Sequence, residues 1–489
     1  MRLMIAGGGG FRVPLVYRAL CSGPYSGLVG EVVLFDVDGG RLAAIEAVLR
    51  SLGPGISRSP EVGSAPAGSP AVGRSSGRPP AVTSTTSLSQ ALKGTDMVFA
   101  AIRPGGTAGR VADERVAQDL GLLGQETTGA GGISYALRSI PAMVELARSM
   151  RTHCPDAWLI NFTNPAGMVT EALVPVLGRK VIGICDSASA LVHRAARAAG
   201  VPLPSGKLDG VGYYGLNHLG WLYRLESGGR DVLPGLLADA GALASFEEGR
   251  LFPQPFLRDL GLLPNEYLFY YYEAARAAAG MRAMAKTRGE SIHGQQAELY
   301  PRLASAGKEA YGLWEAARLS REEGYLAEGR AGGEARNPED LAGGGYEQVA
   351  LAVMRALGGG GGVGEAGAGA ATELILNTPN FTGQSPAPGG TQAAIPGLPA
   401  DAVVEVPCTV TPEGAMPIPQ DRPAEPQLRL LHQVKRVERL TVRAASTGDR
   451  DAALEAFAGH PLVGSAGLAE ALLSGYESAF PELAELWRR

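Results

Sequence analysis

A short apolar run that ends in four consecutive glycines constrains the fold of this chain more than any other feature. Residues 3–6 read as a buried strand, Gly7, Gly8, Gly9 and Gly10 as a tight turn, and residues 14–20 as a helix. A second apolar run, residues 32–35, ends at Asp36. Glycines in such a turn let the backbone approach a pyrophosphate at the helix N-terminus, and an acid after the second strand accepts ribose hydroxyls. The order therefore predicts a dinucleotide site.

This predicted site comprises the four glycines, Phe11 and Asp36. A carboxylate at position 36 would repel a ribose phosphate, which favours NAD over NADP. A ligand-free tight turn is the alternative, because the chain is rich in glycine, with 69 in 489 residues.

Three further apolar runs, residues 97–102, 158–161 and 181–184, read as strands followed by polar loops or helices. Strands that alternate with helices form a parallel sheet with crossover helices. We therefore predict an α/β fold, with a Rossmann-like doubly wound parallel sheet in residues 1–200. A C-terminal mixed α/β (α+β) domain, residues 201–489, would carry substrate, metal and oligomer contacts.

Composition narrows the class of protein. The net charge is -5, so a basic nucleic-acid footprint is absent. The four cysteines are scattered without a CxxC pair, which favours a reducing compartment. No signal peptide and no run of 18 apolar residues is present. We expect a cytoplasmic protein without membrane contact, and flexible loops within residues 53–86 and 358–370, which are rich in glycine and other small residues.

Two residues in separate segments are candidates for a metal site. Cys185 ends the strand-like run VIGIC, and His218 lies in YYGLNHLGW. A thiolate and an imidazole can hold a divalent ion and leave positions open for substrate oxygens. Core packing of the cysteine and a structural role of the histidine are the alternatives.

Polar side chains also follow other predicted strands. Asn164 lies in NFTNP, where an amide can hold sugar hydroxyls, although Asn-Pro is also typical of turns. Arg103 and Arg110 follow the strand at 97–102, and guanidinium groups suit phosphates or vicinal hydroxyls. The polar, glycine-rich loop at residues 124–129 is more typical of binding than of packing.

In combination, eight segments resemble the family 4 glycoside hydrolases, and within that family the 6-phospho-β-glucosidases. They are DMVFAAIRPGGTAGR, GLLGQETTGAGGISYALRSIP, LINFTNPAGMVTEA, VIGICDS, YYGLNHLGW, LPNEYLFYYY, VPCTV and VKRVERLT. The resemblance implies NAD and a divalent metal, usually manganese, as cofactors. It implies transient oxidation of the sugar C3 by NAD, removal of the C2 proton, elimination at C1, addition of water and return of the hydride.

The resemblance also implies roles for individual residues. Cys185 and His218 correspond to the metal ligands. Tyr267 corresponds to the base at C2, and Asp186 would protonate the leaving group. The implied substrate contacts are Arg110, Asn164, Asn217 and Arg288, and Arg103 is assigned to the cofactor. The expected substrate is a phosphorylated disaccharide or aryl glycoside, and the expected assembly is a homodimer or homotetramer.

Two departures from the family pattern leave alternatives open. The nucleotide loop reads GGGGFRVP, without the hydroxyl residues of relatives, and Asp-Ser-Ala follows Cys185 where many phospho-β-glucosidases have Asn-Val-Pro. An aspartate there is familiar from phospho-α-glucosidases. A 6-phospho-α-glucosidase, an α-galactosidase or α-glucuronidase, a net NAD-dependent polyol or hydroxy-acid dehydrogenase, and a non-catalytic NAD-binding protein are the other hypotheses.

Overall fold

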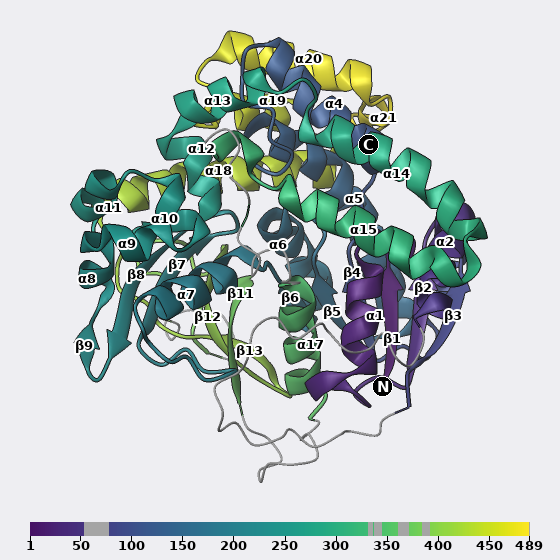
Figure 1. Ribbon diagram of the computed structural model, residues 1–489. Coiled ribbons are helices and arrows are strands. Elements are labelled where there is room, and N and C mark those ends of the chain that lie inside the picture. The colour runs from purple at the N-terminus through teal and green to yellow at the C-terminus, as the bar shows by residue number, and fades with distance from the viewer. Residues whose placement is uncertain (53–77, 331–335, 337–344, 360–370, 384–391, 489) are drawn as a thin grey trace.

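One mixed β-sheet runs through the described part of the molecule and connects its two halves (Figure 1). The structure, a computed structural model, describes residues 1–52, 78–330, 336, 345–359, 371–383 and 392–488. The strands of both predicted domains belong to the same sheet, because β11 pairs with β6. The division of the chain at residue 200 therefore remains a prediction.

Six parallel strands form the N-terminal half of the sheet. In spatial order they are β3 (Ala81–Thr85), β2 (Glu31–Phe35), β1 (Arg2–Ala6), β4 (Met97–Ala100), β5 (Trp158–Asn161) and β6 (Val181–Gly183). This 3-2-1-4-5-6 order is that of a dinucleotide-binding Rossmann sheet, and its switch point lies between β1 and β4. The predicted Rossmann-like fold is confirmed.

Antiparallel strands extend the sheet beyond β6. They are, in order, β11 (Thr372–Pro379), β12 (Val403–Thr411), β7 (Val211–Leu216), β8 (Leu219–Ser227) and β10 (Leu263–Pro264), with β13 (Gly414–Pro417) on β12 and β9 (Arg230–Asp231) on β8. The hairpin β7–β8 was not among the predicted elements. The expectation of a mixed C-terminal half is confirmed.

Helices cover both faces of the parallel strands. Successive strand residues point to opposite sides of the sheet, so each strand contributes apolar side chains to two cores. Leu3 and Ile5 join the core on one face, whereas Met4 and Ala6 join the core on the other. The connecting helices are α1 (Val13–Cys21), α2 (Gly39–Ser51), α3 (Leu88–Leu92), α4 (Gly106–Asp119), α5 (Gly129–His153), α6 (Ala166–Leu177) and α7 (Ser187–Ala198). Burial on both faces explains why these strands are continuous apolar runs.

Two helices from the C-terminal half lie across the nucleotide-binding half. Helix α14 packs on α2 and α4, and α15 packs on α2 and α14 (Figure 1). The helices after β8 are α8 (Leu233–Ala238), α9 (Ala240–Ala244), α10 (Glu247–Leu251), α11 (Gln254–Leu260), α12 (Phe269–Tyr272), α13 (Ala274–Ala283), α14 (Arg288–Ser305), α15 (Ala310–Glu323) and α17 (Tyr346–Leu357). Short 3₁₀ turns are η1 (Gly23–Tyr25), η2 (Gly178–Lys180), η3 (Glu266–Leu268), η4 (Gly307–Glu309) and η5 (Ala327–Gly329).

The last helices pack on α4, α5 and α6 at the far face of the sheet. They are α18 (Glu425–Thr447), α19 (Arg450–Gly459), α20 (Ala466–Ala479) and α21 (Glu482–Leu486). Helix α15 is separated from α14 at Gly307 (φ +54°), and α19 is separated from α18 at Gly448 (φ +72°). The left-handed backbone that these two glycines adopt cannot continue a right-handed helix.

Part of the segment predicted as a flexible insertion is ordered. Residues 81–85 form β3, which pairs with β2, while residues 53–77 lie outside the described residues, as do residues 360–370. Within the described part of the chain, no helix is both long enough and apolar enough to cross a membrane.

Candidate active site

The carboxyl ends of the parallel strands open into a cavity of about 1100 Å³. Segments that follow β1, β2, β4, β5 and β6 line it, and residues from the hairpin β7–β8, η3, α14 and α15 close it. The predicted site residues in its wall are Gly7, Gly10, Phe11, Asp36, Arg103, Arg110, Asn164, Cys185, Asp186, His218, Tyr267 and Arg288. Ligands of open α/β sheets bind at this position.

Close backbone packing requires glycine at both ends of the turn after β1. Gly7 has a φ of +87°, and a Cβ there would lie 2.6 Å from the carbonyl oxygen of Ala101. A Cβ on Gly10 would lie 2.8 Å from the carbonyl oxygen of Gly7. A side chain at either position would therefore clash with backbone atoms and distort the turn.

Gly8 and Gly9 do not line the cavity. A Cβ on Gly8 would lie 2.7 Å from the Cβ of Leu34, and one on Gly9 would lie 2.6 Å from the Cβ of Arg41. These two glycines let the turn approach β2 and α2. The Gly9 amide donates to Asp36 Oδ2 over 3.0 Å, so the carboxylate predicted to bind ribose also holds the turn.

Cys185 and His218 meet in the cavity wall. The Sγ atom of Cys185, just after β6, lies 3.6 Å from Nε2 of His218, which occupies the turn of the hairpin β7–β8. Both residues are buried. Ser187 Oγ lies 3.3 Å from the same sulfur. The two candidate metal ligands are thus side by side and on the same cavity as the glycine turn.

The protonation of this pair follows from its burial. Burial lowers the pKa of His218 to about 3 although Glu126 partly opposes the shift, so the imidazole is neutral. Burial, with the nearby charges of Glu405 and Asp186, raises the pKa of the Cys185 thiol well above its usual value. His218 has a φ of 64°, a backbone conformation that is uncommon outside glycine.

The pair fits one divalent ion in an open site. Two ligands about 2.0–2.3 Å from one ion lie roughly 3.6 Å apart at a tetrahedral angle. The other nitrogen of His218, Nδ1, is buried without a hydrogen-bond partner among the described residues. No third His, Cys, Asp or Glu completes a metal cluster in the described part of the chain, so the remaining positions would be available to substrate oxygens.

Tyr267 lies directly on His218. Their rings stack with centroids 3.7 Å apart and planes 8° from parallel. The Tyr267 hydroxyl lies 3.3 Å from the Tyr325 hydroxyl. Burial, with the charge of Glu266, raises the pKa of Tyr267 well above its usual value, so a cation beside His218 would be needed to make it a base.

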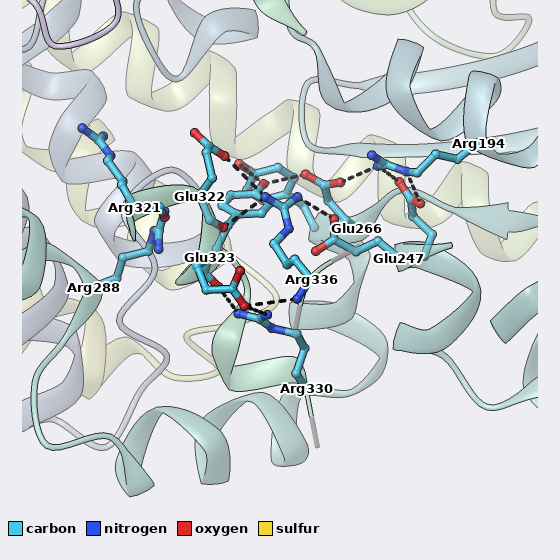
Figure 2. Close-up of polar contacts among 12 residues, drawn as sticks. Arg194, Glu247, Glu266, Arg288, Arg321, Glu322, Glu323, Arg330 and Arg336 are labelled. Atoms are coloured by element: carbon cyan, nitrogen blue, oxygen red, sulfur yellow. Dashed lines mark hydrogen bonds and ion pairs between the residues drawn. The ribbon is translucent and has the colours of Figure 1, made fainter. Parts of the chain in front are cut away.

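A buried charge cluster, part of which Figure 2 shows, adjoins this tyrosine through Tyr325. The Tyr325 hydroxyl donates to Glu266 Oε1 over 2.5 Å, and Arg194 pairs with both Glu266 and Glu248. Burial and the charge of Glu248 raise the pKa of Glu266 to about 8, although Arg194 opposes the shift. Near neutral pH the protonated form of the Glu266 carboxyl is therefore favoured.

Two predicted anion-binding arginines share one carboxylate. Glu126 Oε2 lies 2.5 Å from Arg103 Nη2, and Glu126 Oε1 lies 2.5 Å from Arg110 Nη1. Arg110 also donates to Glu114 over 2.8 Å. Burial would raise the pKa of Glu126, but Arg103, Arg110 and Arg321 lower it to about 2. The loop at residues 124–129 thus supplies the counter-charge for the cavity's guanidinium groups.

The other predicted substrate residues differ in how their side chains are used. Asn164 has a buried Oδ1 without a partner among the described residues, so it can still bind a ligand. Arg288 donates to the carbonyl oxygen of Arg321 over 3.1 Å. Asn217 does not line the cavity. Its side-chain amide accepts from Ala166 N over 3.1 Å and donates to Glu405 over 3.3 Å.

Asp186 lies in the cavity wall beside the metal-ligand pair. It precedes α7, and its Cβ packs so closely on Gly345 that a Cβ on that glycine would lie 2.8 Å away. Its charge contributes, after that of Glu322, to raising the pKa of Arg12. The carboxylate therefore faces the arginine that follows Phe11 in the sequence.

Sequence reasoning missed several polar groups that build the site. They are Arg12, Glu126, Glu266, Arg321, Tyr325 and Glu405. Glu126 could have been found, because it lies in the loop that the sequence marks as a binding loop. Arg12 directly follows Phe11, next to the predicted glycine turn. The others come from η3, α15, the segment after α15 and β12, and only the tertiary structure brings these segments to the site.

A Rossmann-type α/β protein with a polar cavity at its strand ends is the class that this fold and site define. The chain matches the family 4 glycosyl hydrolase profile over residues 70–201 and the family 4 glycosyl hydrolase C-terminal domain over residues 213–463. The chain belongs to glycosyl hydrolase family 4, as the sequence resemblance indicated.

Individual relatives agree with this membership. A probable 6-phospho-beta-glucosidase of Bacillus subtilis is 30% identical over 396 residues, which cover 80% of each chain. The maltose-6'-phosphate glucosidase of the same organism is 37% identical over 205 residues, 38% of this chain and 45% of its own length. A 6-phospho-beta glucosidase from Thermotoga maritima, solved with manganese, NAD+ and glucose-6-phosphate, has a TM-score of 0.74 and 25% identity, with 99% of both chains covered.

Proposed function

We propose that the protein hydrolyses 6-phospho-β-glucosides with NAD and a divalent metal, manganese, as cofactors. One observation carries the proposal. The sulfur of Cys185 lies 3.6 Å from the imidazole of His218, which stacks on the ring of Tyr267, in the same cavity as the glycine turn. Relatives named 6-phospho-beta-glucosidase and a structural neighbour that holds manganese, NAD+ and glucose-6-phosphate support it.

The chain's residues divide into those that hold cofactors and those that handle substrate. Gly7, Gly10 and Asp36 would hold the dinucleotide, and Cys185 and His218 the metal. When bound, the dinucleotide would take up and return the sugar's C3 hydride, and the metal would polarise the C2 and C3 oxygens.

Proton transfer would fall to two side chains in the cavity wall. Tyr267, deprotonated to the phenolate, would accept the C2 proton at its phenolic oxygen, which lies 3.3 Å from the Tyr325 hydroxyl. Asp186, beside the metal ligands, would donate a proton to the leaving oxygen at C1 and then accept one from the incoming water. Because the hydride returns in each turnover, the enzyme would release aglycone without net NADH.

Positive side chains would bind the sugar's phosphate. Arg110 and Arg288 are the candidates, since both line the cavity and guanidinium groups bind phosphate with charge-assisted hydrogen bonds. The unpartnered Oδ1 of Asn164 would accept from a sugar hydroxyl. Asn217 would act indirectly, because its amide anchors the hairpin turn to Glu405.

A second specificity, 6-phospho-α-glucoside hydrolysis, has its own support. An aspartate at the position of Asp186 is familiar from phospho-α-glucosidases. The maltose-6'-phosphate glucosidase relative is 37% identical over its matched part. An assay of p-nitrophenol release from both anomers of p-nitrophenyl glucoside 6-phosphate, with and without NAD and manganese, tests both. We expect release from the β anomer, and only when NAD and manganese are both present. Release in the absence of the two cofactors would refute the mechanism.

Three wider proposals accompany this function. The four cysteines are all free, which supports a reducing compartment such as the cytoplasm. Residues 1–200 would form the cofactor half and residues 201–489 the substrate half. Family resemblance supports a homodimer or homotetramer, which sedimentation of the purified protein would establish.

A further inference from the structure

Arg321, near the end of α15, places an unpaired positive charge in the cavity wall. Its Nε and Nη1 atoms are buried and have no hydrogen-bond partner among the residues that the structure describes. In Figure 2 no dashed line joins its guanidinium to an acidic residue, so none of the hydrogen bonds and ion pairs drawn there involves it. Its neighbour Glu322 is already used, since it pairs with Arg12 and Arg336.

The surroundings of Arg321 are positive rather than neutral. Burial, then the charges of Arg12, Arg288 and Arg110, lower the pKa of Arg321 well below its usual value. A guanidinium does not lose its proton in proteins, and the two carboxylates that act on Arg321, Glu322 and Glu126, already pair with other arginines. Such an arrangement is costly unless a ligand supplies the negative charge.

Contacts of α14 and α15 place Arg321 beside the glycine turn. The Arg321 guanidinium lies 4.9 Å from the centre of the Phe11 ring. On the same helix, Trp314 Nε1 donates to the carbonyl oxygen of Phe11 over 2.7 Å. From α14, the Tyr300 hydroxyl donates to the carbonyl oxygen of Gly9 over 2.8 Å. Both helices are thus fastened to the turn at which a dinucleotide's phosphates lie.

We infer that Arg321 binds the pyrophosphate of the dinucleotide from the side opposite the glycine turn. The inference rests on the proposed function, because it takes the turn to be the NAD site. A phosphorylated sugar offers the same phosphoryl chemistry, and Arg288 and Arg110 are the arginines proposed to bind it. Contact with Phe11 assigns Arg321 to the dinucleotide.

Direct binding measurements test this assignment without requiring turnover. Fluorescence titration with NADH would compare wild type with Arg321→Met, which keeps the length of the side chain and removes its charge. We expect the Kd for NADH to rise about 10- to 100-fold, the range for one lost charge-assisted hydrogen bond. The affinity for ADP-ribose, which retains the pyrophosphate, should fall by the same factor. The affinities for adenosine and glucose 6-phosphate should not change.

Matched variants protect the interpretation. Arg318→Met removes an arginine one turn earlier that pairs with Glu315 and does not line the cavity, so its Kd for NADH should match wild type. Arg321→Lys keeps the charge and should lose less affinity than the methionine variant. If Arg321→Met did not fold, the lysine variant alone would test the assignment. It would have to bind NADH and ADP-ribose less tightly than wild type does, with unchanged affinity for adenosine and glucose 6-phosphate.

Other outcomes overturn the assignment. An unchanged Kd for NADH, a loss confined to glucose 6-phosphate, or an equal loss for adenosine would each contradict it. If the wild-type protein bound no NADH, the proposed function would fall together with this inference. If wild type bound NADH and Arg321→Met bound it equally well, only the role of Arg321 would be lost.

Discussion

His218 Nε2 lies 3.6 Å from Cys185 Sγ although the two strands that deliver these residues are not neighbours in the sheet. Strands β11 and β12, from residues 372–411, separate β6 from β7. Glu405 on β12 accepts from Asn217 over 3.3 Å, and from Asn377 on β11 over 3.1 Å. Strands β11 and β12 thus hold Asn217 in the turn of the hairpin β7–β8, and His218 is the residue that follows it.

Replacement of the sulfur tests the metal site. Cys185→Ser should lower kcat/KM by about 100-fold or more, because a catalytic metal contributes several kcal/mol to the transition state. Cys21→Ser is the matched control, since Cys21 is free and does not line the cavity. Equal manganese activation of both variants and of wild type would eliminate Cys185 as a ligand.

Manganese affinity should increase with pH. Burial holds the Cys185 thiol protonated by raising its pKa, whereas the pKa of His218 is lowered to about 3, so only the thiol must lose a proton when metal binds. Isothermal titration at pH 6–8 in buffers of different ionisation enthalpy should give about one proton released per ion. A pH-independent affinity with no proton release would contradict the thiolate assignment.

Removal of one hydroxyl tests the base. Tyr267→Phe keeps the ring stacked on His218 and should lower kcat by about 10²- to 10⁴-fold. Exchange of the C2 hydrogen with solvent deuterium, followed by NMR, should be lost with it. Tyr271→Phe is the control, because Tyr271 lies in the same segment, LPNEYLFYYY, but does not line the cavity. Retained exchange in Tyr267→Phe would assign the proton to another group.

A phosphate-specific effect is expected at Arg288. Arg288→Met should raise KM for a glucoside 6-phosphate by about 10- to 100-fold, since a charged hydrogen bond to the phosphate is lost. Arg282→Met, on the exposed part of α13, should leave KM unchanged. Parallel assays with the unphosphorylated glucoside should show no difference between the variants. An equal change with both substrates would mean that Arg288 does not recognise the phosphate.

Stability should fall as the pH rises above the ordinary range of a carboxyl group. Glu266 has its pKa raised from 4.5 to about 8, so its folded-state stabilisation is complete below about pH 4.5 and is lost as pH increases through 8. Glu266→Gln, which cannot ionise, should flatten this dependence. Thermal unfolding of both proteins at pH 5–9 measures it. Parallel pH profiles would show that Glu266 does not titrate in this interval.

Sequence alone determined the architecture of the first half. The apolar runs that became β1, β2, β4, β5 and β6 are continuous because both faces of a parallel sheet are buried, and the glycines after β1 admit no side chain. Local chemistry therefore located the nucleotide turn, and the polar residues after each strand identified one edge of the sheet as the site.

Only the tertiary structure decided how the second half completes that site. The hairpin β7–β8 carries no strong strand pattern, and β11 and β12 enter the sheet between β6 and β7 from far along the chain. Helices α14 and α15 bring Tyr300 and Arg321 to the nucleotide turn, and Arg288 to the cavity wall, through contacts that no local pattern encodes. Long-range pairing depends on packing of distant segments, so the charge balance of the cavity follows from the folded chain and not from its motifs.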